Sequence, residues 1–233
     1  VDDAQMEAAI TPRTRLFLLC NPHNPVGRVF RRAELERMAA ICLRHDLVIC
    51  SDEIHCELLF SGERHIPIAM LSPEVEHRTI TLMAPSKTFN IAGLHCAVTI
   101  IPDETLRQQF LAAYQGLVSS VSITGYVAAL AAYRHGDPWL QEVLTYLEGN
   151  RDYLADYVNN YLPGVRMLKP EGTYLAWLDC REAGLQAPDR FFLERARVAL
   201  NSGAAFGRGG EGFARLNFAC RRALLTEALE RMR

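Results

Sequence analysis

Short apolar runs that alternate with amphipathic segments constrain the fold of this chain more than any other feature. Residues 15–20 (RLFLLC), 47–50 (LVIC), 79–83 (TITLM) and 96–101 (CAVTII) are largely apolar, and runs of this length are typical of buried strands. Residues 33–45 instead place apolar side chains at helical spacing. Continuous apolar strands separated by helices predict an α/β fold whose mainly parallel sheet is covered on both faces.

The second half of the chain has a different organisation. Asp137-Pro138 is a strong helix start, and the helix that it opens is expected to span 138–161, roughly 36 Å. Shorter elements follow, namely a strand near 174–178, a helix near 188–200, a strand at 213–220 and a helix at 222–231. We therefore expect two domains, 1–140 and 141–233, with their boundary inside the long helix.

Composition and charge exclude several classes of protein. Of 233 residues, 49% are hydrophobic and 22% charged, which excludes intrinsic disorder. With a net charge of -2, the chain has no excess of positive charge that would attract nucleic acid or an anionic membrane. No run of about 18 apolar residues exists to span a bilayer, and the first residues lack the features of a signal peptide. We expect neither nucleic-acid nor membrane partners. The first residue is Val1 rather than Met, which suggests a fragment or an unusual start.

The seven cysteines indicate a reducing compartment. Most lie in apolar runs, where a free thiol behaves as a small hydrophobe, and no C-x-x-C pair exists. The nearest approaches to metal-ligand spacing are Cys20 with His23 and His55 with Cys56, which lack the paired pattern of structural zinc sites. We expect a cytoplasmic protein without a metal site.

Lysine is rare in this chain. Of its 25 Lys and Arg residues, only Lys87 and Lys169 are lysine. Where the chain needs positive charge it uses arginine, so a lysine can serve a purpose that arginine cannot, such as forming an imine. A GC-rich genome would produce the same bias. Lys87 follows the strand at 79–83, whereas Lys169 precedes a proline and is expected to be an exposed loop residue.

Polar side chains gather where the predicted strands end, and ligands bind at that edge of open α/β sheets. Asp52 follows the strand at 47–50, Ser86 and Lys87 follow the strand at 79–83, and Asn24 lies in the rigid turn NPHNPVG. Taken singly, Asp52 could be a helix cap and Lys87 a surface residue. A carboxylate at a buried strand end nevertheless needs a partner, and a pyridinium nitrogen would supply one.

In this order after successive strands, these motifs resemble the fold-type I pyridoxal-phosphate enzymes, the aminotransferase class I and II superfamily. The resemblance covers nearly the whole chain. It implies that Lys87 forms the imine with the cofactor and that Asp52 pairs with the pyridine nitrogen. It further implies contacts of Asn24 and His55 with the ring 3'-oxygen and of Ser86 with the phosphate. A neutral His95 stands near the position where many members have a phosphate-binding cation.

Two segments, NPHNPVGR and SDEIHCELLF, look most like the MalY/PatB-type cystathionine β-lyases. The resemblance implies a C–S β-lyase that acts on cystathionine or cysteine S-conjugates and releases a thiol, pyruvate and ammonia. An aminotransferase on the same scaffold and a catalytically inactive truncated fragment remain alternatives. A nucleotide-binding domain is disfavoured, because no glycine-rich phosphate loop follows any strand.

The strand at 213–220 supplies the expected substrate contact. Phe213, Arg215 and Asn217 share one of its faces. Arg215 is either a solvated residue or a planar fork that grips a carboxylate. The family's R-x-N segment implies that Arg215 binds the substrate α-carboxylate. Tyr174 resembles a pocket-lining position, with a half-buried strand aromatic as the alternative.

Family members are considerably longer than this chain. The part upstream of NPHNPVG that normally carries the phosphate loop and the ring-stacking aromatic is not present in it. The resemblance therefore implies an incomplete three-layer, PLP-transferase-like large domain plus a small α+β C-terminal domain. It also implies an amino-acid substrate and a homodimer whose active sites lie at the subunit interface.

Overall fold

The computed structural model describes residues 2–233, and this part of the chain divides into two compact units. The first unit runs to Pro22 and resumes over Val29–Glu57 and Arg64–Leu140. The second comprises His23–Arg28, Leu58–Glu63 and Gln141–Arg233. Two short segments from the first half of the sequence thus belong to the second unit.

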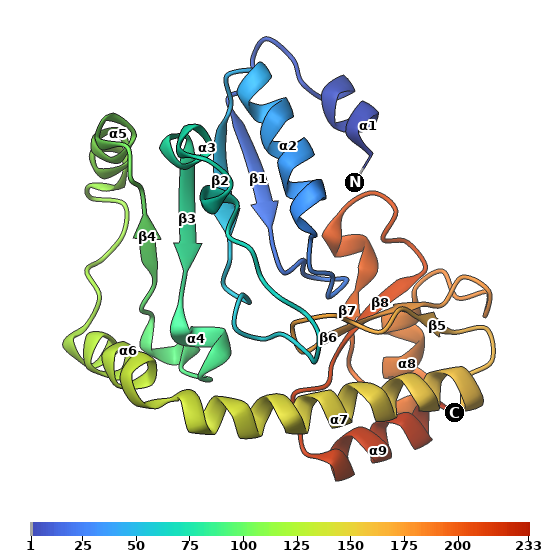
Figure 1. Ribbon diagram of the computed structural model, residues 1–233. Helices are drawn as coiled ribbons and strands as arrows, with labels where there is room; N and C mark the ends of the chain where they lie inside the picture. The colour runs from blue at the N-terminus through green and yellow to red at the C-terminus, as the bar shows by residue number, and fades with distance from the viewer. Residues whose placement is uncertain (1) are drawn as a thin grey trace. The chain divides into compact units, whose positions relative to one another are not determined.

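The first unit is built on a four-stranded sheet. Its strands lie in the order β1 (Leu16–Cys20), β2 (Val48–Asp52), β3 (Thr79–Met83) and β4 (Val98–Ile100). The first three are parallel and β4 is antiparallel to β3, as Figure 1 shows. The predicted α/β fold with a mainly parallel sheet is therefore confirmed. The register aligns Cys20 with Asp52 and Asp52 with Leu82, so these strands end at one edge.

One face of this sheet packs on helix α2 (Arg32–Arg44). Leu35, Met38 and Cys42 of the helix form a buried core with Leu19 and Ile49 of the strands, which follows from the helical spacing of these apolar residues. The remaining helices of the unit are α1 (Asp3–Ala8), α3 (Pro73–His77), α4 (Pro85–Thr88), α5 (Glu104–Tyr114) and α6 (Ile123–His135), with short turns at Ile68–Met70 and Ala92–Leu94. Of these, α3 lies between β2 and β3 and α4 between β3 and β4, whereas α1 precedes β1 and α5 and α6 follow β4.

The second unit combines an antiparallel sheet with helices. Helix α7 (Asp137–Tyr161) runs into it from the first unit, and its strands lie in the order β5 (Arg166–Met167), β6 (Leu175–Asp179), β8 (Phe213–Asn217), β7 (Asn201–Ser202). Helices α8 (Pro188–Ala196) and α9 (Arg222–Met232) complete it, with a short turn at Gly203–Phe206. Mixed helices and antiparallel strands agree with the expected α+β character.

Two of these elements are shorter than the sequence predicts. Helix α8 ends at Ala196 rather than near residue 200, because Arg197 takes a left-handed conformation with φ 58°. Strand β8 ends at Asn217 rather than at Cys220, because the Asn217 side chain accepts a hydrogen bond from the Ala219 backbone N–H at 2.8 Å. A side chain that bonds the backbone two residues on favours a turn.

The loop that contains Asn24 is fixed to the second unit through Gly27. The Gly27 carbonyl accepts hydrogen bonds from the backbone N–H groups of Glu171 (2.8 Å) and Gly172 (2.9 Å). Gly27 has φ +71°, and a Cβ there would lie 2.4 Å from the Pro170 Cβ. Only glycine allows this close approach.

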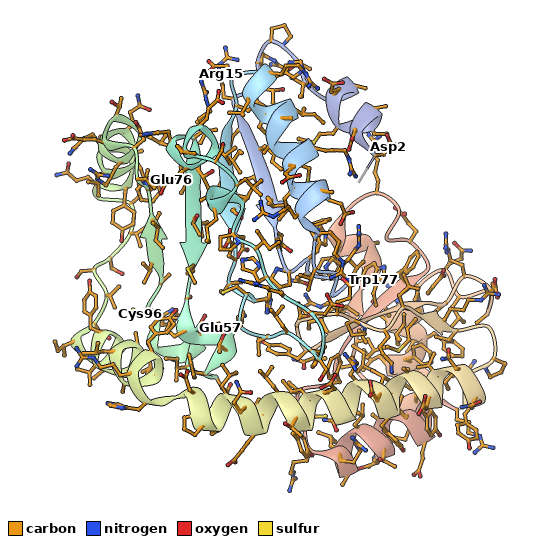
Figure 2. The ribbon with its side chains drawn as sticks, viewed as in Figure 1. Asp2, Arg15, Glu57, Glu76, Cys96 and Trp177 are labelled. Carbon is orange, nitrogen blue, oxygen red and sulfur yellow. The ribbon has the colours of Figure 1, made fainter. Side chains whose placement is uncertain are left out.

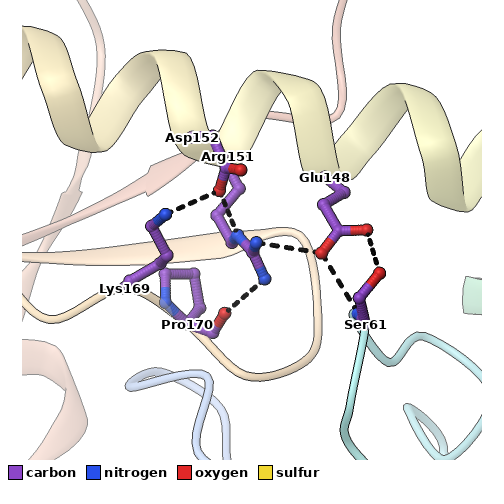
Figure 3. Close-up of polar contacts among 6 residues, drawn as sticks. All are labelled: Ser61, Glu148, Arg151, Asp152, Lys169 and Pro170. Atoms are coloured by element: carbon purple, nitrogen blue, oxygen red, sulfur yellow. Dashed lines mark hydrogen bonds and ion pairs between the residues drawn. The ribbon is translucent and has the colours of Figure 1, made fainter.

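Arg151 ties the segment Leu58–Glu63 to helix α7. Its buried guanidinium donates to Glu148 (3.0 Å), Asp152 (2.8 Å) and the Pro170 carbonyl (3.4 Å), as Figure 3 shows. It also lies 4.4 Å from the centroid of the Phe60 ring. The network extends at both ends through Ser61, which donates to Glu148 at 2.7 Å, and Lys169, which lies 3.0 Å from Asp152. The hydrogen bond from Ser61 lowers the pKa of Glu148.

Replacing Arg151 with alanine is expected to lower the free energy of unfolding by about 3 kcal/mol, because it removes the charged partner from a buried network. Urea unfolding followed by circular dichroism measures the change. Arg166→Ala is the matched control, since Arg166 is paired with Glu182 on the surface and such pairs contribute less than about 1 kcal/mol. Equal losses in the two variants would show that the Arg151 network has no special role.

The cysteines and the helix lengths bear on the reactivity of the chain and on its relation to membranes. None of the seven cysteines is in a disulfide within residues 2–233. Burial raises the pKa of Cys42 to about 11 and that of Cys180 to about 12, so these two thiols are poor nucleophiles. Within residues 2–233, no helix has the length and apolar character needed to cross a membrane.

Candidate active site

Asp52 occupies the last position of β2, at the edge where the parallel strands end. The side chain is half-buried and accepts a hydrogen bond from the Ile54 backbone N–H at 3.1 Å. Its backbone carbonyl accepts from the Asn21 N–H at 3.0 Å. The carboxylate is therefore held on a rigid strand end, where a ligand can approach it.

Ser86 and Lys87 lie in helix α4, which begins two residues after β3 ends. Both side chains are half-buried. The helix is anchored by Phe89, whose ring packs against Tyr133 (centroids 5.9 Å apart) and Trp139 (6.2 Å). Asp52 pairs with Leu82 of β3, so the lysine and the carboxylate arise from neighbouring strands at the same edge of the sheet.

Two histidines lie close to this edge in sequence. His55 is buried in the turn that follows β2. His95 is exposed and left-handed (φ 50°), three residues before β4 begins. The first unit thus brings together the predicted residues Asp52, His55, Ser86 and Lys87 around one sheet edge.

Arg215 is the centre of the polar group in the second unit. Its guanidinium donates to the Asn24 side-chain oxygen at 2.7 Å and to the Asn201 side-chain oxygen at 3.0 Å. Within the described residues, its buried Nε has no hydrogen-bond partner. Desolvation lowers the pKa of Arg215, although an arginine remains charged at any physiological pH. A partly desolvated guanidinium with an unused donor is suited to binding an anion.

An aromatic cluster supports this arginine. The guanidinium lies 4.7 Å from the centroid of the Phe206 ring. Trp177, labelled in Figure 2, is edge-on to Phe206 at 5.5 Å and stacked on Phe213 at 5.2 Å, with their planes 12° apart. Trp177 is also the residue that pairs with Arg215 between β6 and β8. Phe206 thus packs on the guanidinium, and Trp177 packs on Phe206 and Phe213, which supports the planar group from one ring.

Tyr174 precedes β6 and is half-buried. Its backbone carbonyl accepts from the Phe218 N–H at 3.0 Å. Burial raises the pKa of Tyr174, and the charge of Arg215 partly opposes that effect. The second unit thus assembles the predicted residues Asn24, Tyr174 and Arg215, which are up to 191 positions apart in the chain.

Sequence reasoning missed two parts of this arrangement. Asn201 accepts from Arg215, but nothing in its sequence surroundings distinguishes it from a turn asparagine. Glu53 and His65 form a buried hydrogen-bonded pair next to Asp52, with 2.7 Å between the Glu53 carboxylate and the His65 Nε2. The acidic pair Asp52-Glu53 at the end of an apolar strand was the available signal, because two adjacent carboxylates there cannot both lack partners.

Comparison with known families decides the classification. The sequence pattern of the family Aminotransferase class I and II matches residues 1–232. The chain belongs to this family. The fold described above agrees with that membership, since solved structures of similar proteins superpose on the whole chain.

Three similar proteins illustrate the relationship. Cystathionine beta-lyase PatB of Bacillus subtilis (strain 168) is 40% identical over 240 residues, covering 100% of this chain and 61% of that protein. The PLP-bound C-S lyase of Staphylococcus hominis is 35% identical with a TM-score of 0.93, covering 100% of this chain and 57% of that one. Cystalysin of Treponema denticola, which contains pyridoxal 5'-phosphate, is 32% identical with a TM-score of 0.95, covering 100% and 60%. The chain therefore spans about three-fifths of the length of the relatives that it matches.

Proposed function

We propose that this chain takes part in a pyridoxal-phosphate-dependent C–S β-lyase that acts on cystathionine or cysteine S-conjugates. The assignment of the cofactor rests on the placement of Lys87 in the helix that follows β3, with Asp52 at the end of neighbouring β2. The similarity to PatB at 40% identity carries the choice of a lyase over an aminotransferase.

The residues at the sheet edge fit this cofactor chemically. Lys87 offers an amine for an aldehyde, Asp52 a carboxylate for a pyridinium, and Ser86 a hydroxyl for a phosphate. The exposed His95, three residues before β4, stands where many family members have a phosphate-binding cation, and a neutral imidazole there would weaken the contact with the phosphate. When bound, pyridoxal phosphate supplies an electron sink for the negative charge that develops on the substrate Cα.

Each side chain then has a separate task. Lys87 would hold the aldehyde of the cofactor, and its amine would take the Cα proton of the substrate as general base. Asp52 keeps a proton on the ring nitrogen, because a carboxylate favours the charged form of a neighbouring cation. His55 is proposed to contact the ring 3'-oxygen, as is Asn24.

Arg215 and its neighbours are proposed to orient the substrate. The planar guanidinium, already fixed by Asn24 and Asn201, binds the α-carboxylate, and Tyr174 lines the pocket. The Cβ–S bond would then break, and the departing sulfur would take a proton from Lys87 to leave as a thiol. Addition of water to the remaining three-carbon unit would yield pyruvate and ammonia.

We further infer that the protein acts in the cytoplasm as a homodimer. Cysteines that form no disulfide within residues 2–233 support the compartment. Exposed apolar side chains on α6, including Ile123, Val127 and Leu130, support association. Sedimentation of the protein at several concentrations tests the dimer.

Arg215→Lys is expected to raise the KM for cystathionine by about 100-fold, because an ammonium replaces a charge-assisted bidentate grip with a point charge. The value of kcat is expected to change far less, since the reacting atoms are not touched. Steady-state kinetics measures both constants. Arg190→Lys, at an exposed position of α8, is the control, and an Arg215→Lys enzyme with an unchanged KM would contradict the assignment.

The lyase reaction is tested by a product assay. The protein is incubated with pyridoxal phosphate and cystathionine without any 2-oxo acid, and pyruvate is measured with lactate dehydrogenase. Release of pyruvate under these conditions supports the lyase. A requirement for a 2-oxo acid would instead identify an aminotransferase, and the absence of any turnover would reject the proposed function for this chain.

A further inference from the structure

Behind Asp52 lies a buried polar network that the proposed chemistry does not use. Glu53 is 1% exposed, and its carboxylate lies 2.7 Å from the His65 Nε2. The other carboxylate oxygen accepts a hydrogen bond from the Ser51 hydroxyl at 2.9 Å. The His65 Nδ1 lies 3.5 Å from the Asn21 side-chain nitrogen. Buried ionisable groups are costly unless they are paired, so this network needs an explanation.

The network surrounds the peptide group that joins Asp52 to Glu53. The carbonyl of this peptide accepts from the Asn21 N–H at 3.0 Å, and its N–H donates to the Leu82 carbonyl at 2.9 Å. Successive side chains of an extended segment point to opposite faces. Ser51 and Glu53 therefore point away from the face that presents Asp52, and anchoring them fixes the direction of the Asp52 carboxylate.

The hydrogen bonds of the Asn21 amide indicate which group the His65 ring faces. The Asn21 side-chain oxygen accepts from the Phe30 backbone N–H at 3.1 Å, so its nitrogen is the group that faces His65. That nitrogen is a donor, so it pairs with His65 when Nδ1 is the acceptor of the ring and Nε2–H donates to Glu53. In this arrangement His65 connects the carboxylate of one strand end to the side chain that follows the neighbouring strand.

We infer that Glu53 and His65 are positioning residues for Asp52. They connect the ends of β1 and β2 and keep the Asp52 carboxylate directed toward the bound pyridine ring. This inference rests on the proposed function for the identity of the ring, whereas the coupling between Glu53, His65 and Asn21 is a property of the chain alone.

The two contacts of His65 can be removed separately. His65→Gln places an amide near the position of Nε2 and keeps the contact to Glu53, while it loses the contact to Asn21. His65→Asn does the reverse. Glu53→Gln removes the charge but retains an oxygen for His65 and a donor for Ser51, whereas Glu53→Ala removes both. The first three variants retain a polar side chain in the network and are expected to fold.

Amide hydrogen exchange of the protein without cofactor provides the first readout. In His65→Gln, His65→Asn and Glu53→Ala, exchange at the Asn21 and Glu53 amides is expected to accelerate by about tenfold or more, because an unpaired buried partner weakens the local structure by that factor. Glu53→Gln is expected to exchange like the wild type. The reference is the Ile49 amide, which bonds Arg78 at the other end of β2 and is expected not to change.

Binding of pyridoxal phosphate, with the visible circular dichroism of the bound form, provides the second readout. His65→Gln, His65→Asn and Glu53→Ala are expected to bind pyridoxal phosphate at least about tenfold more weakly than Glu53→Gln does. They are also expected to show an altered visible spectrum. If amide exchange accelerates equally at Ile49, or does not accelerate at Asn21 and Glu53, the positioning role is overturned.

If exchange accelerates only at Asn21 and Glu53 while pyridoxal-phosphate binding and the visible spectrum are unchanged, the network does not act on the cofactor site. A wild-type chain that binds no pyridoxal phosphate would reject the proposed function. Amide exchange without cofactor would still show whether Glu53, His65 and Asn21 are coupled.

Discussion

Lys87→Ala is expected to lower the rate of pyruvate release from cystathionine by about 10⁴-fold, the upper end of what a general base contributes. The substitution removes the amine that we propose to hold the cofactor aldehyde and to take the Cα proton. Both tasks require an unprotonated primary amine at the end of β3, and the other side chains proposed for this edge, Asp52, His55 and Ser86, do not offer one. Initial rates with saturating pyridoxal phosphate measure the loss.

Lys169 supplies the matched control for this prediction. It is the other lysine of the chain, it is half-exposed, and it pairs with Asp152 in the second unit. Lys169→Ala is expected to leave the rate within about twofold of the wild type, since surface ion pairs contribute little. Equal rates for Lys87→Ala and the wild type would remove Lys87 from the chemistry.

Asp52→Asn is expected to lower the same rate by roughly 10²–10³-fold, the cost of removing one electrostatic partner of a developing charge. The amide has nearly the same shape as the carboxylate and can still accept from the Ile54 N–H, so folding is preserved. It cannot hold a proton on the ring nitrogen, because it carries no charge. Asp156→Asn, at an exposed position of α7, is the control.

The prediction for Asp52 has a second, spectroscopic consequence. Loss of the ring proton changes the visible absorption of bound pyridoxal phosphate, so the Asp52→Asn spectrum is expected to differ from that of the wild type at the same pH. Asp52→Glu is expected to restore part of the rate, since the charge remains. A rate and a spectrum unaffected by Asp52→Asn would contradict the proposed pairing.

The elements that the sequence predicts well are those dictated by local patterns. The strands at 15–20, 47–50 and 79–83 are uninterrupted apolar runs, and each corresponds to a parallel strand of the first sheet. Helix α7 begins at Asp137, one residue before the start at 138 that Asp137-Pro138 predicts, and ends at Tyr161 as predicted. The prediction that these apolar runs are buried is wrong for β1, whose Leu16 and Leu18 are 45% and 71% exposed. The run at 96–101 likewise forms a strand, β4, whose three residues are exposed.

The features that the sequence does not predict depend on tertiary contacts. Helix α6 has apolar residues on most of its surface, with only Gly125 and Ala129 buried, so no helical periodicity indicates it. Strands β5 and β7 have two residues each and form only because longer strands pair with them. The segments His23–Arg28 and Leu58–Glu63 join the second unit through hydrogen bonds to residues more than 100 positions away.

The residues of the candidate site also fall into those that local sequence indicates and those that depend on tertiary contacts. Lys87, Asp52 and Arg215 are recognisable because each residue type stands at a strand end or on a strand face where its chemistry needs a partner. The Glu53–His65 pair is not, because its two members are 12 positions apart and meet only when the loop before Ile68–Met70 folds back.

Mapping the covalent attachment of pyridoxal phosphate tests the proposed chemistry most directly. The protein is incubated with pyridoxal phosphate, reduced with borohydride and digested, and the modified peptide is sequenced by mass spectrometry. The expected result is a single pyridoxyl adduct on Lys87, with Lys169 unmodified. An unmodified Lys87, or an adduct distributed equally over both lysines, would contradict the assignment of Lys87 and with it the proposed function.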